Sequence, residues 1–88
     1  MGMARVLMYC TAACPFCQSA ERLLAEKGAQ VEKVRVDLEP RRRGEMVQNS
    51  GRQTVPQIWI GGRHIGGSDE LHGLERSGEL DQLLAKAT

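Results

Sequence analysis

Apolar and polar residues follow two different periods along this chain, which predicts strands and helices in alternation. Residues 5–10 are apolar after the leading arginine, as in a central strand that is buried on both faces. Residues 15–27 carry apolar side chains at helical spacing and are followed by Gly28, a helix stop signal. Charged and apolar residues then alternate over 33–38, which predicts an edge strand that buries one face. Its inward positions are Val34, Val36 and Leu38.

The second half of the chain predicts a hairpin that follows a short helix. The helix covers residues 42–49, and residues 57–60 form the next strand. Gly61-Gly62 is a two-residue hairpin signal, so residues 63–65 should return antiparallel to that strand. Trp59 lies inside the first strand of the hairpin, and we expect its ring in the core.

Two more helices are predicted after the hairpin. Gly66-Gly67 breaks the strand, and Ser68 is a favourable N-cap for the third helix. Asp69 and Glu70 complement the positive end of that helix. A last helix begins at about residue 79 and turns three leucines inward, giving the order β-α-β-α-β-β-α-α. The leucines are Leu80, Leu83 and Leu84.

Size and composition exclude several classes of protein. Eighty-eight residues make one small domain, spanning residues 1–88. The formal net charge is +1, from 12 Lys and Arg against 11 Asp and Glu, so no broad basic surface indicates nucleic-acid binding. No apolar run approaches membrane-spanning length, and the first predicted strand leaves no room for a signal peptide. We therefore expect a cytoplasmic protein that contacts neither nucleic acid nor membrane.

The chemistry of the chain is expected at Cys14-Pro15-Phe16-Cys17, which opens the first helix. Residues three apart on a helix share a face, with Cα atoms roughly 5–6 Å apart, so the two thiols can close a disulfide. Pro15 suits the first helical position, which leaves Cys14 at or beside the N-cap, where unpaired amides and the helix dipole favour a thiolate. In a reducing compartment, such a pair near a β-α-β unit is typical of thiol-disulfide chemistry.

Other interpretations of the cysteines and histidines are disfavoured. A zinc site needs four ligands, and neither a second cysteine pair nor ligand-like spacing of His64 and His72 is present in the sequence. We therefore expect no metal, and ordinary surface or packing roles for both histidines. Cys10, at the end of a buried strand, is expected to be a small apolar filler and not a third redox centre.

The element order and four motifs together resemble the dithiol glutaredoxins, a family with a minimal thioredoxin-like fold, across essentially the whole chain. The motifs are Tyr9, Cys14-Pro15-Phe16-Cys17, Thr54-Val55-Pro56 and Gly66-Gly67-Ser68-Asp69. The resemblance implies an α/β fold with a four-stranded mixed sheet in the strand order 2-1-3-4, flanked by helices. It also implies that Cys14 is the nucleophile and Cys17 the resolving thiol. Because Cys17 lies inside the first helical turn, its pKa should be the higher of the two.

Glutaredoxins use glutathione as a co-substrate, and the resemblance assigns part of its site to the Thr54-Val55-Pro56 segment. Pro56 corresponds to the cis-proline of the family. That turn would expose the N–H and C=O groups of Val55 beside the thiols, where an extended substrate can align its sulfur.

The resemblance assigns the γ-glutamyl end of glutathione to the Gly-Gly-Ser-Asp motif. Gly67 permits close backbone approach, and the amides of Ser68 and Asp69 at a helix N-terminus suit a carboxylate. The side chain of Asp69 can take the ammonium group. The alternative is that Ser68 and Asp69 are merely a helix cap.

Three more positions bear on the expected site. Arg43 matches a family position that reaches the glycine carboxylate, although the Arg41-Arg42-Arg43 run can equally be a solvated charge cluster. Phe16 stands in place of the commoner tyrosine and keeps the aromatic ring. Thr11 replaces a common lysine, which removes a cation near the thiol.

The resemblance implies a monomeric, glutathione-dependent oxidoreductase that reduces protein-glutathione mixed disulfides and low-molecular-weight or protein disulfides. Its expected partners are glutathione and glutathionylated or disulfide-bonded proteins, with ribonucleotide reductase one recipient that the resemblance allows.

One alternative function is a carrier in which Cys14 of two subunits and two glutathiones hold a [2Fe-2S] cluster. Pro15 disfavours this, because cluster-holding relatives more often have Gly or Ser there. Another is an electron donor reduced by thioredoxin reductase, against which Ser68 and Asp69 argue.

Overall fold

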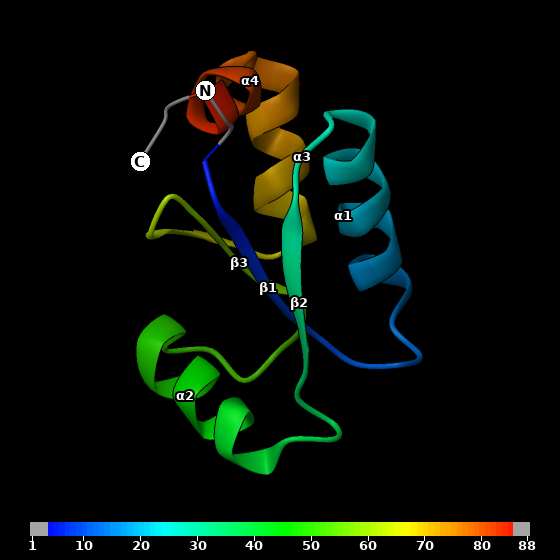
Figure 1. The fold of residues 1–88 in the computed structure, drawn as a ribbon, viewed down its shortest axis with the longest axis vertical. Coiled ribbons are helices and arrows are strands. Elements are labelled where there is room, and N and C mark those ends of the chain that lie inside the picture. The colour runs from blue at the N-terminus through cyan, green and yellow to red at the C-terminus, as the bar shows by residue number, and fades with distance from the viewer. Residues whose placement is uncertain (1–3, 86–88) are drawn as a thin grey trace.

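The computed structural model describes residues 4–85, which form one four-stranded sheet and four helices (Figure 1). The order β-α-β-α-β-β-α-α and the strand order β2-β1-β3-β4 confirm the predicted fold. The elements are β1 (Val6–Cys10), α1 (Pro15–Glu26), β2 (Val31–Arg35), α2 (Pro40–Ser50), β3 (Gln57–Ile60), β4 (Arg63–Gly66), α3 (Ser68–Ser77) and α4 (Glu79–Ala85).

The central strand β1 leads into the candidate active-site turn, residues 11–14, which precedes α1. It pairs parallel with β2 and antiparallel with β3, and β3 continues antiparallel to β4. The hairpin between β3 and β4 turns at Gly61 and Gly62, both at positive φ, which glycine adopts without steric cost. Four of the five residues of β1 are buried, as expected of a central strand.

Helices cover both faces of the sheet, with α2 apart from α1, α3 and α4 (Figure 1). Because successive strand residues face opposite sides, Met8 and Cys10 belong to one core and Tyr9 to the other. The first core joins the sheet to buried residues of α1, α3 and α4, among them Leu24 and Leu71. The second contains Tyr9, Val34, Val36 and Met46 of α2.

The predicted position of the second strand is wrong. It covers residues 31–35, not 33–38, because parallel pairing aligns Val31 with Val6 and Arg35 with Cys10. One further bond, from the amide of Val36 to the carbonyl of Cys10, ends the ladder where β1 ends. Beyond it the chain turns toward α2, with the amides of Leu38 and Glu39 both donating to the carbonyl of Arg35. Val36 is buried as predicted, but Leu38 is 68% exposed.

Two further expectations about burial need correction. Trp59 and Leu83 are half-buried instead of lying fully in the core. Trp59 packs edge-on against Tyr9, with ring centroids 5.4 Å apart. Among residues 4–85, no helix has the length and apolarity needed to span a membrane.

Candidate active site

Cys14 is the N-cap of α1, with extended backbone angles of φ −134° and ψ 99°. Pro15 occupies the first turn, where its missing N–H leaves no helical bond unmade. The backbone amide of Cys17 donates to the Cys14 sulfur at 3.1 Å. The sulfur therefore takes the place that a serine or aspartate oxygen has in an ordinary N-cap, as predicted, and a thiolate there gains a hydrogen bond from an otherwise unpaired amide.

Cys17 lies one turn into the helix and is 4% exposed. Burial raises the pKa of its thiol to about 12, and the hydrogen bond with Cys14 adds to the rise, while a hydrogen bond from the Thr11 amide opposes it. Cys17 is therefore held as a thiol at neutral pH. The rise has the direction expected for a shielded thiol inside the first helical turn.

The Val55-Pro56 peptide bond is cis, as the resemblance implied. The carbonyl oxygen of Val55 lies 3.9 Å from the Cys14 sulfur and accepts from its thiol. Val55 and Cys14 are 41 residues apart in the chain, so the tertiary fold is what brings this backbone edge beside the thiol.

A cavity of ≈ 320 Å³, which we call the Pro56 cavity, opens between the cis-proline loop and the start of α3. Phe16, 63% exposed, forms part of its wall beside the active-site turn. Seven of the residues expected to bind substrate line it. They are Phe16, Thr54, Val55, Pro56, Gly67, Ser68 and Asp69.

The start of α3 differs from the prediction by one residue. Gly67, not Ser68, is the N-cap, and its amide donates to the Glu70 carboxylate at 2.7 Å. The glutamate three residues into the helix satisfies the N-cap amide, so the serine is left in the first turn, where it is buried. A Cβ on Gly67 would lie 3.3 Å from the carbonyl oxygen of Pro56. The two sides of the Pro56 cavity therefore meet at a position that favours glycine.

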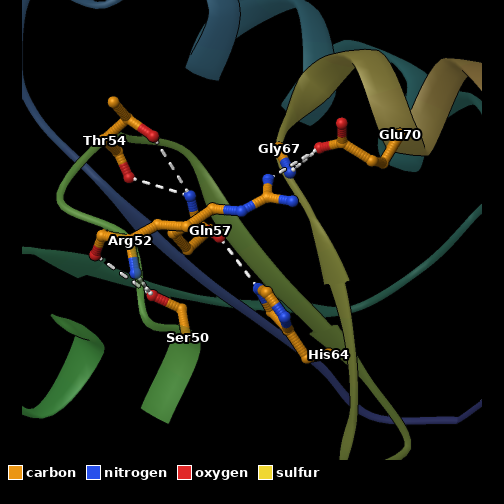
Figure 2. Close-up of polar contacts among 7 residues, drawn as sticks. All are labelled: Ser50, Arg52, Thr54, Gln57, His64, Gly67 and Glu70. Atoms are coloured by element: carbon orange, nitrogen blue, oxygen red, sulfur yellow. Dashed lines mark hydrogen bonds and ion pairs between the residues drawn. The ribbon is translucent and has the colours of Figure 1, made fainter. Parts of the chain in front are cut away.

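A polar network stands behind the cis-proline loop (Figure 2). The side-chain amide of Gln57, 1% exposed, donates to the carbonyl of Thr54 at 3.1 Å and to its hydroxyl at 3.3 Å. His64 on β4 hydrogen-bonds the Gln57 oxygen at 2.8 Å. Burial lowers the pKa of His64, with the nearby Arg52 charge adding to the effect. The neutral ring that this favours can donate one N–H to Gln57, so the loop is held by the sheet beneath it.

The cation that borders the Pro56 cavity is Arg52. Its guanidinium lies 3.1 Å from the Glu70 carboxylate (Figure 2). This ion pair connects the loop after α2 to the start of α3, and both residues line the cavity. Arg43, the cation expected there, donates instead to the carbonyl of Gln53 at 3.1 Å and lies outside the lining of the cavity. Its neighbour Arg42 is also engaged elsewhere, because it pairs with Glu45 at 3.0 Å.

Sequence reasoning missed Arg52, Gln57 and Glu70 as lining residues of the Pro56 cavity. Arg52 and Gln57 flank the Thr54-Val55-Pro56 motif, and this adjacency was the one available signal. The partner of Arg52 is Glu70, 18 residues away along the chain, and the partner of Gln57 is His64, 7 residues away. No local sequence pattern predicts such pairs.

Other parts of the molecule offer less chemistry. A larger hollow of ≈ 560 Å³ is lined by Arg5, Gln30 and Trp59 among others, and no thiol borders it. His72 hydrogen-bonds Ser19 at 3.0 Å and so joins α3 to α1. Within residues 4–85, no cluster of three or more Cys, His, Asp or Glu residues could hold a metal ion.

Comparison with known proteins places these features in one family. Residues 6–65 match the family model described as Glutaredoxin, a range that takes in both thiols and Pro56. The chain is 48% identical over 83 residues to a glutaredoxin of Pseudomonas aeruginosa, a match that covers 94% of this chain and 99% of that protein. The solution structure of glutaredoxin from Brucella melitensis aligns with a TM-score of 0.85 at 43% identity, covering 100% and 98% of the two chains. A buckwheat glutaredoxin in complex with glutathione aligns with a TM-score of 0.85 at 29% identity, covering 93% and 81%.

Proposed function

This chain belongs to the glutaredoxin family, and on that premise we propose that it is a glutathione-dependent oxidoreductase whose reactive thiol is Cys14. A thiol-disulfide oxidoreductase is the activity that family membership supports. The finer proposal is that the preferred substrates are protein-glutathione mixed disulfides. Low-molecular-weight disulfides and protein disulfides follow by the same chemistry.

The observation that carries the proposal is the contrast between the two thiols. The Cys17 amide donates to the Cys14 sulfur, whereas burial raises the pKa of Cys17 to about 12. A hydrogen bond to the Cys14 sulfur favours Cys14 as the leaving group when an incoming thiol displaces it from a mixed disulfide. Cys17 is restricted to the neighbouring sulfur, because it is buried and held as a thiol.

In the proposed reaction, the Cys14 thiolate attacks the glutathione sulfur of a mixed disulfide, and the protein thiolate leaves. A second glutathione thiolate then attacks the glutathione bound to Cys14, which releases oxidised glutathione and restores the Cys14 thiolate. For a protein disulfide, the Cys14 thiolate attacks one sulfur and the other leaves as a thiolate, which gives a mixed disulfide between Cys14 and the protein. Cys17 then loses its proton and attacks the Cys14 sulfur, and the second protein sulfur leaves as a thiolate. The Cys14–Cys17 disulfide so formed is then reduced by two glutathiones.

The Pro56 cavity supports glutathione as the co-substrate because its two ends differ in chemistry. We assign the extended cysteinyl backbone to the Val55 edge, beside the Cys14 sulfur. The γ-glutamyl carboxylate would take the amides of Ser68 and Asp69 at the start of α3, and the Asp69 carboxylate the ammonium. The buckwheat relative in complex with glutathione supports this assignment.

The proposal is tested with two single-thiol variants and a glutathionylated protein, under turnover coupled to glutathione reductase. Cys17→Ser is expected to keep deglutathionylation within about threefold of the parent, while Cys14→Ser falls to the uncatalysed rate. Reduction of insulin disulfides should be lost in both variants, because it needs the second thiol. Equal loss of deglutathionylation in both would reject the single-thiol route, and full activity of Cys14→Ser would reject Cys14 as the reactive thiol.

A further inference from the structure

A second, smaller cavity of ≈ 150 Å³ lies between β1, β2 and α1, and we call it the Cys10 cavity. Cys10 and Cys17 both line it, and both are free thiols. Charged side chains complete the wall, from α1 and from β2. They are Glu21, Lys33 and Arg35. One hollow therefore joins the resolving thiol to a cysteine that the proposed reaction does not use.

The sheet register explains why these groups meet. Cys10 pairs with Arg35 across the parallel ladder, and Met8 pairs with Lys33. Residues two apart on a strand share a face, so both cations lie on the face that packs against α1, where Cys17 enters the core. Cys10 is only 2% exposed, and it lines the Cys10 cavity together with Cys17.

Cys17 has one of the other two cysteines as a hydrogen-bond partner and shares a hollow with the other. Its amide donates to the Cys14 sulfur, which lies 3.9 Å from the Val55 carbonyl oxygen. Its thiol accepts a hydrogen bond from the amide of Thr11, the residue that follows Cys10, and Cys17 lines the Cys10 cavity. In a Cys14–Cys17 disulfide, an attack of Cys10 on the Cys17 sulfur would release Cys14.

We propose that Cys10 is a second resolving thiol, which attacks Cys17 in the Cys14–Cys17 disulfide and returns Cys14 to the thiolate form. The Cys10 thiolate forms a bond to the Cys17 sulfur, the Cys14–Cys17 bond breaks, and its electron pair leaves with Cys14. The proton lost by Cys10 passes to solvent, and no external oxidant or reductant is consumed. The product is an internal Cys10–Cys17 disulfide beside a free nucleophile. This inference rests on the proposed Cys14–Cys17 disulfide.

The direction of exchange follows from the surroundings of each sulfur. The amide of Cys17 donates to Cys14, so Cys14 departs as a stabilised anion. Burial raises the pKa of Cys10, and the charges of Glu21 and Asp37 raise it further, while Lys33 and Arg35 lower it. A thiolate of raised basicity is a stronger nucleophile once formed, but only a small fraction is present at neutral pH. The exchange should therefore be slow near neutrality and accelerate as the pH rises.

The consequence for function is a protected oxidised form. Cys10 and Cys17 are both buried, so a disulfide between them is shielded from glutathione. Cys14 is 7% exposed, but its sulfur lies 3.9 Å from the carbonyl of Val55, a residue that lines the Pro56 cavity. The oxidised protein could then still accept glutathione at Cys14 and act as a single-thiol catalyst. Oxidation would then change the substrate range of the protein without abolishing its activity.

The first test needs no Cys14 disulfide and is independent of catalysis. Cys14→Ser is treated with diamide, and its mass is measured intact under dilute conditions. We expect a monomer two hydrogens lighter, with Cys10 and Cys17 both protected from N-ethylmaleimide, while Cys10→Ser/Cys14→Ser loses no hydrogens. A Cys14→Ser protein that keeps both thiols free, or that only forms dimers through Cys17, would overturn the proposal even if glutathione turnover is normal.

The second test follows the exchange in the parent protein. After oxidation, free thiols are blocked with N-ethylmaleimide in denaturant at mildly acidic pH, disulfides are reduced and labelled with iodoacetamide, and residues 6–22 are sequenced by mass spectrometry. Maleimide on Cys14 reports the Cys10–Cys17 isomer, and maleimide on Cys10 reports the Cys14–Cys17 isomer. The rate at which label appears on Cys14 should rise about tenfold per pH unit between about pH 6 and pH 8, below the Cys10 pKa. Maleimide on Cys10 alone, at every pH, rejects the exchange.

Discussion

The side chains of Gln57 and His64 share a hydrogen bond of 2.8 Å between the amide oxygen and Nε2 across neighbouring strands. The amide nitrogen of Gln57 is then free to hold the carbonyl of Thr54 at 3.1 Å. The hydrogen bonds from His64 through Gln57 to Thr54 (Figure 2) thus tie the sheet to the loop whose Val55 carbonyl lies 3.9 Å from the Cys14 sulfur.

Replacing Gln57 with methionine keeps the volume of the buried side chain and removes its hydrogen bonds. The Thr54 carbonyl and the His64 ring then lose their partner, so we expect the free energy of unfolding to fall by about 1–3 kcal/mol, measured by urea denaturation. The matched control is Gln53→Met, because the Gln53 side chain is exposed, and it should stay within about 0.5 kcal/mol of the parent. Equal losses in the two variants would mean that the network adds no stability.

Asp37 links the loop after β2 to the active-site turn. The surroundings of its carboxylate lead us to expect a pH dependence of the free energy of unfolding. Its carboxylate accepts two hydrogen bonds from Arg35, at 2.8 and 2.6 Å. This pair, helped by the Ala12 amide, lowers the pKa of Asp37 from 3.8 to about 2. A carboxyl whose folded pKa is depressed adds stability above its unfolded pKa, and this stability is lost as the pH falls through the folded value.

We therefore expect Asp37→Asn to be less stable than the parent at neutral pH, with a difference that shrinks from about pH 5 downward and vanishes near pH 2. Urea denaturation at a series of pH values measures it. Glu26→Gln serves as control, since Glu26 is exposed on α1, and its difference should be small throughout. A constant deficit of Asp37→Asn down to pH 2 would assign the effect to packing instead of charge.

Two glycines are expected to respond in opposite directions to alanine. Gly44 lies inside α2, and an added Cβ there meets no atom within 4 Å among the described residues, so Gly44→Ala should stabilise by about 0.5–1 kcal/mol. Gly66 has φ +117°, and its added Cβ would lie 2.5 Å from a carboxylate oxygen of Glu70. Gly66→Ala should strain the backbone and displace Glu70 from the Gly67 amide, for a loss of about 1–3 kcal/mol. Thermal and urea denaturation measure both, and stabilisation by Gly66→Ala would contradict the positive φ.

The choice between two arginines can be decided by kinetics with glutathione. Arg52 borders the Pro56 cavity, whereas Arg43 is held by the Gln53 carbonyl. We expect Arg52→Gln to raise the KM for glutathione about 2- to 5-fold, the size of an exposed charge interaction, with less effect at high salt. Arg43→Gln should leave KM within about twofold. The reverse order would restore Arg43 as the cation that the family resemblance suggested.

Local features of the sequence predicted much of this protein. The Cys-x-x-Cys pair with Pro15 located the start of α1, and Gly61-Gly62 located the hairpin, because caps and turns depend on a few adjacent residues. Parallel strand pairing does not depend on adjacent residues, so the alternation around Val34 predicted a position for β2 that is too late in the chain. The periodicity identified a strand, and only its alignment with β1 decided where that strand ends.

The sequence by itself determined the order of the elements and the two thiols, since each depends on residues that are close neighbours in the chain, and its family resemblance indicated most of the lining of the Pro56 cavity. The tertiary structure alone decided that Arg52 and not Arg43 borders that cavity, and that Cys10 shares a hollow with Cys17. The physical reason is that these relationships join segments separated in the chain, and packing of the whole core selects which distant side chains meet.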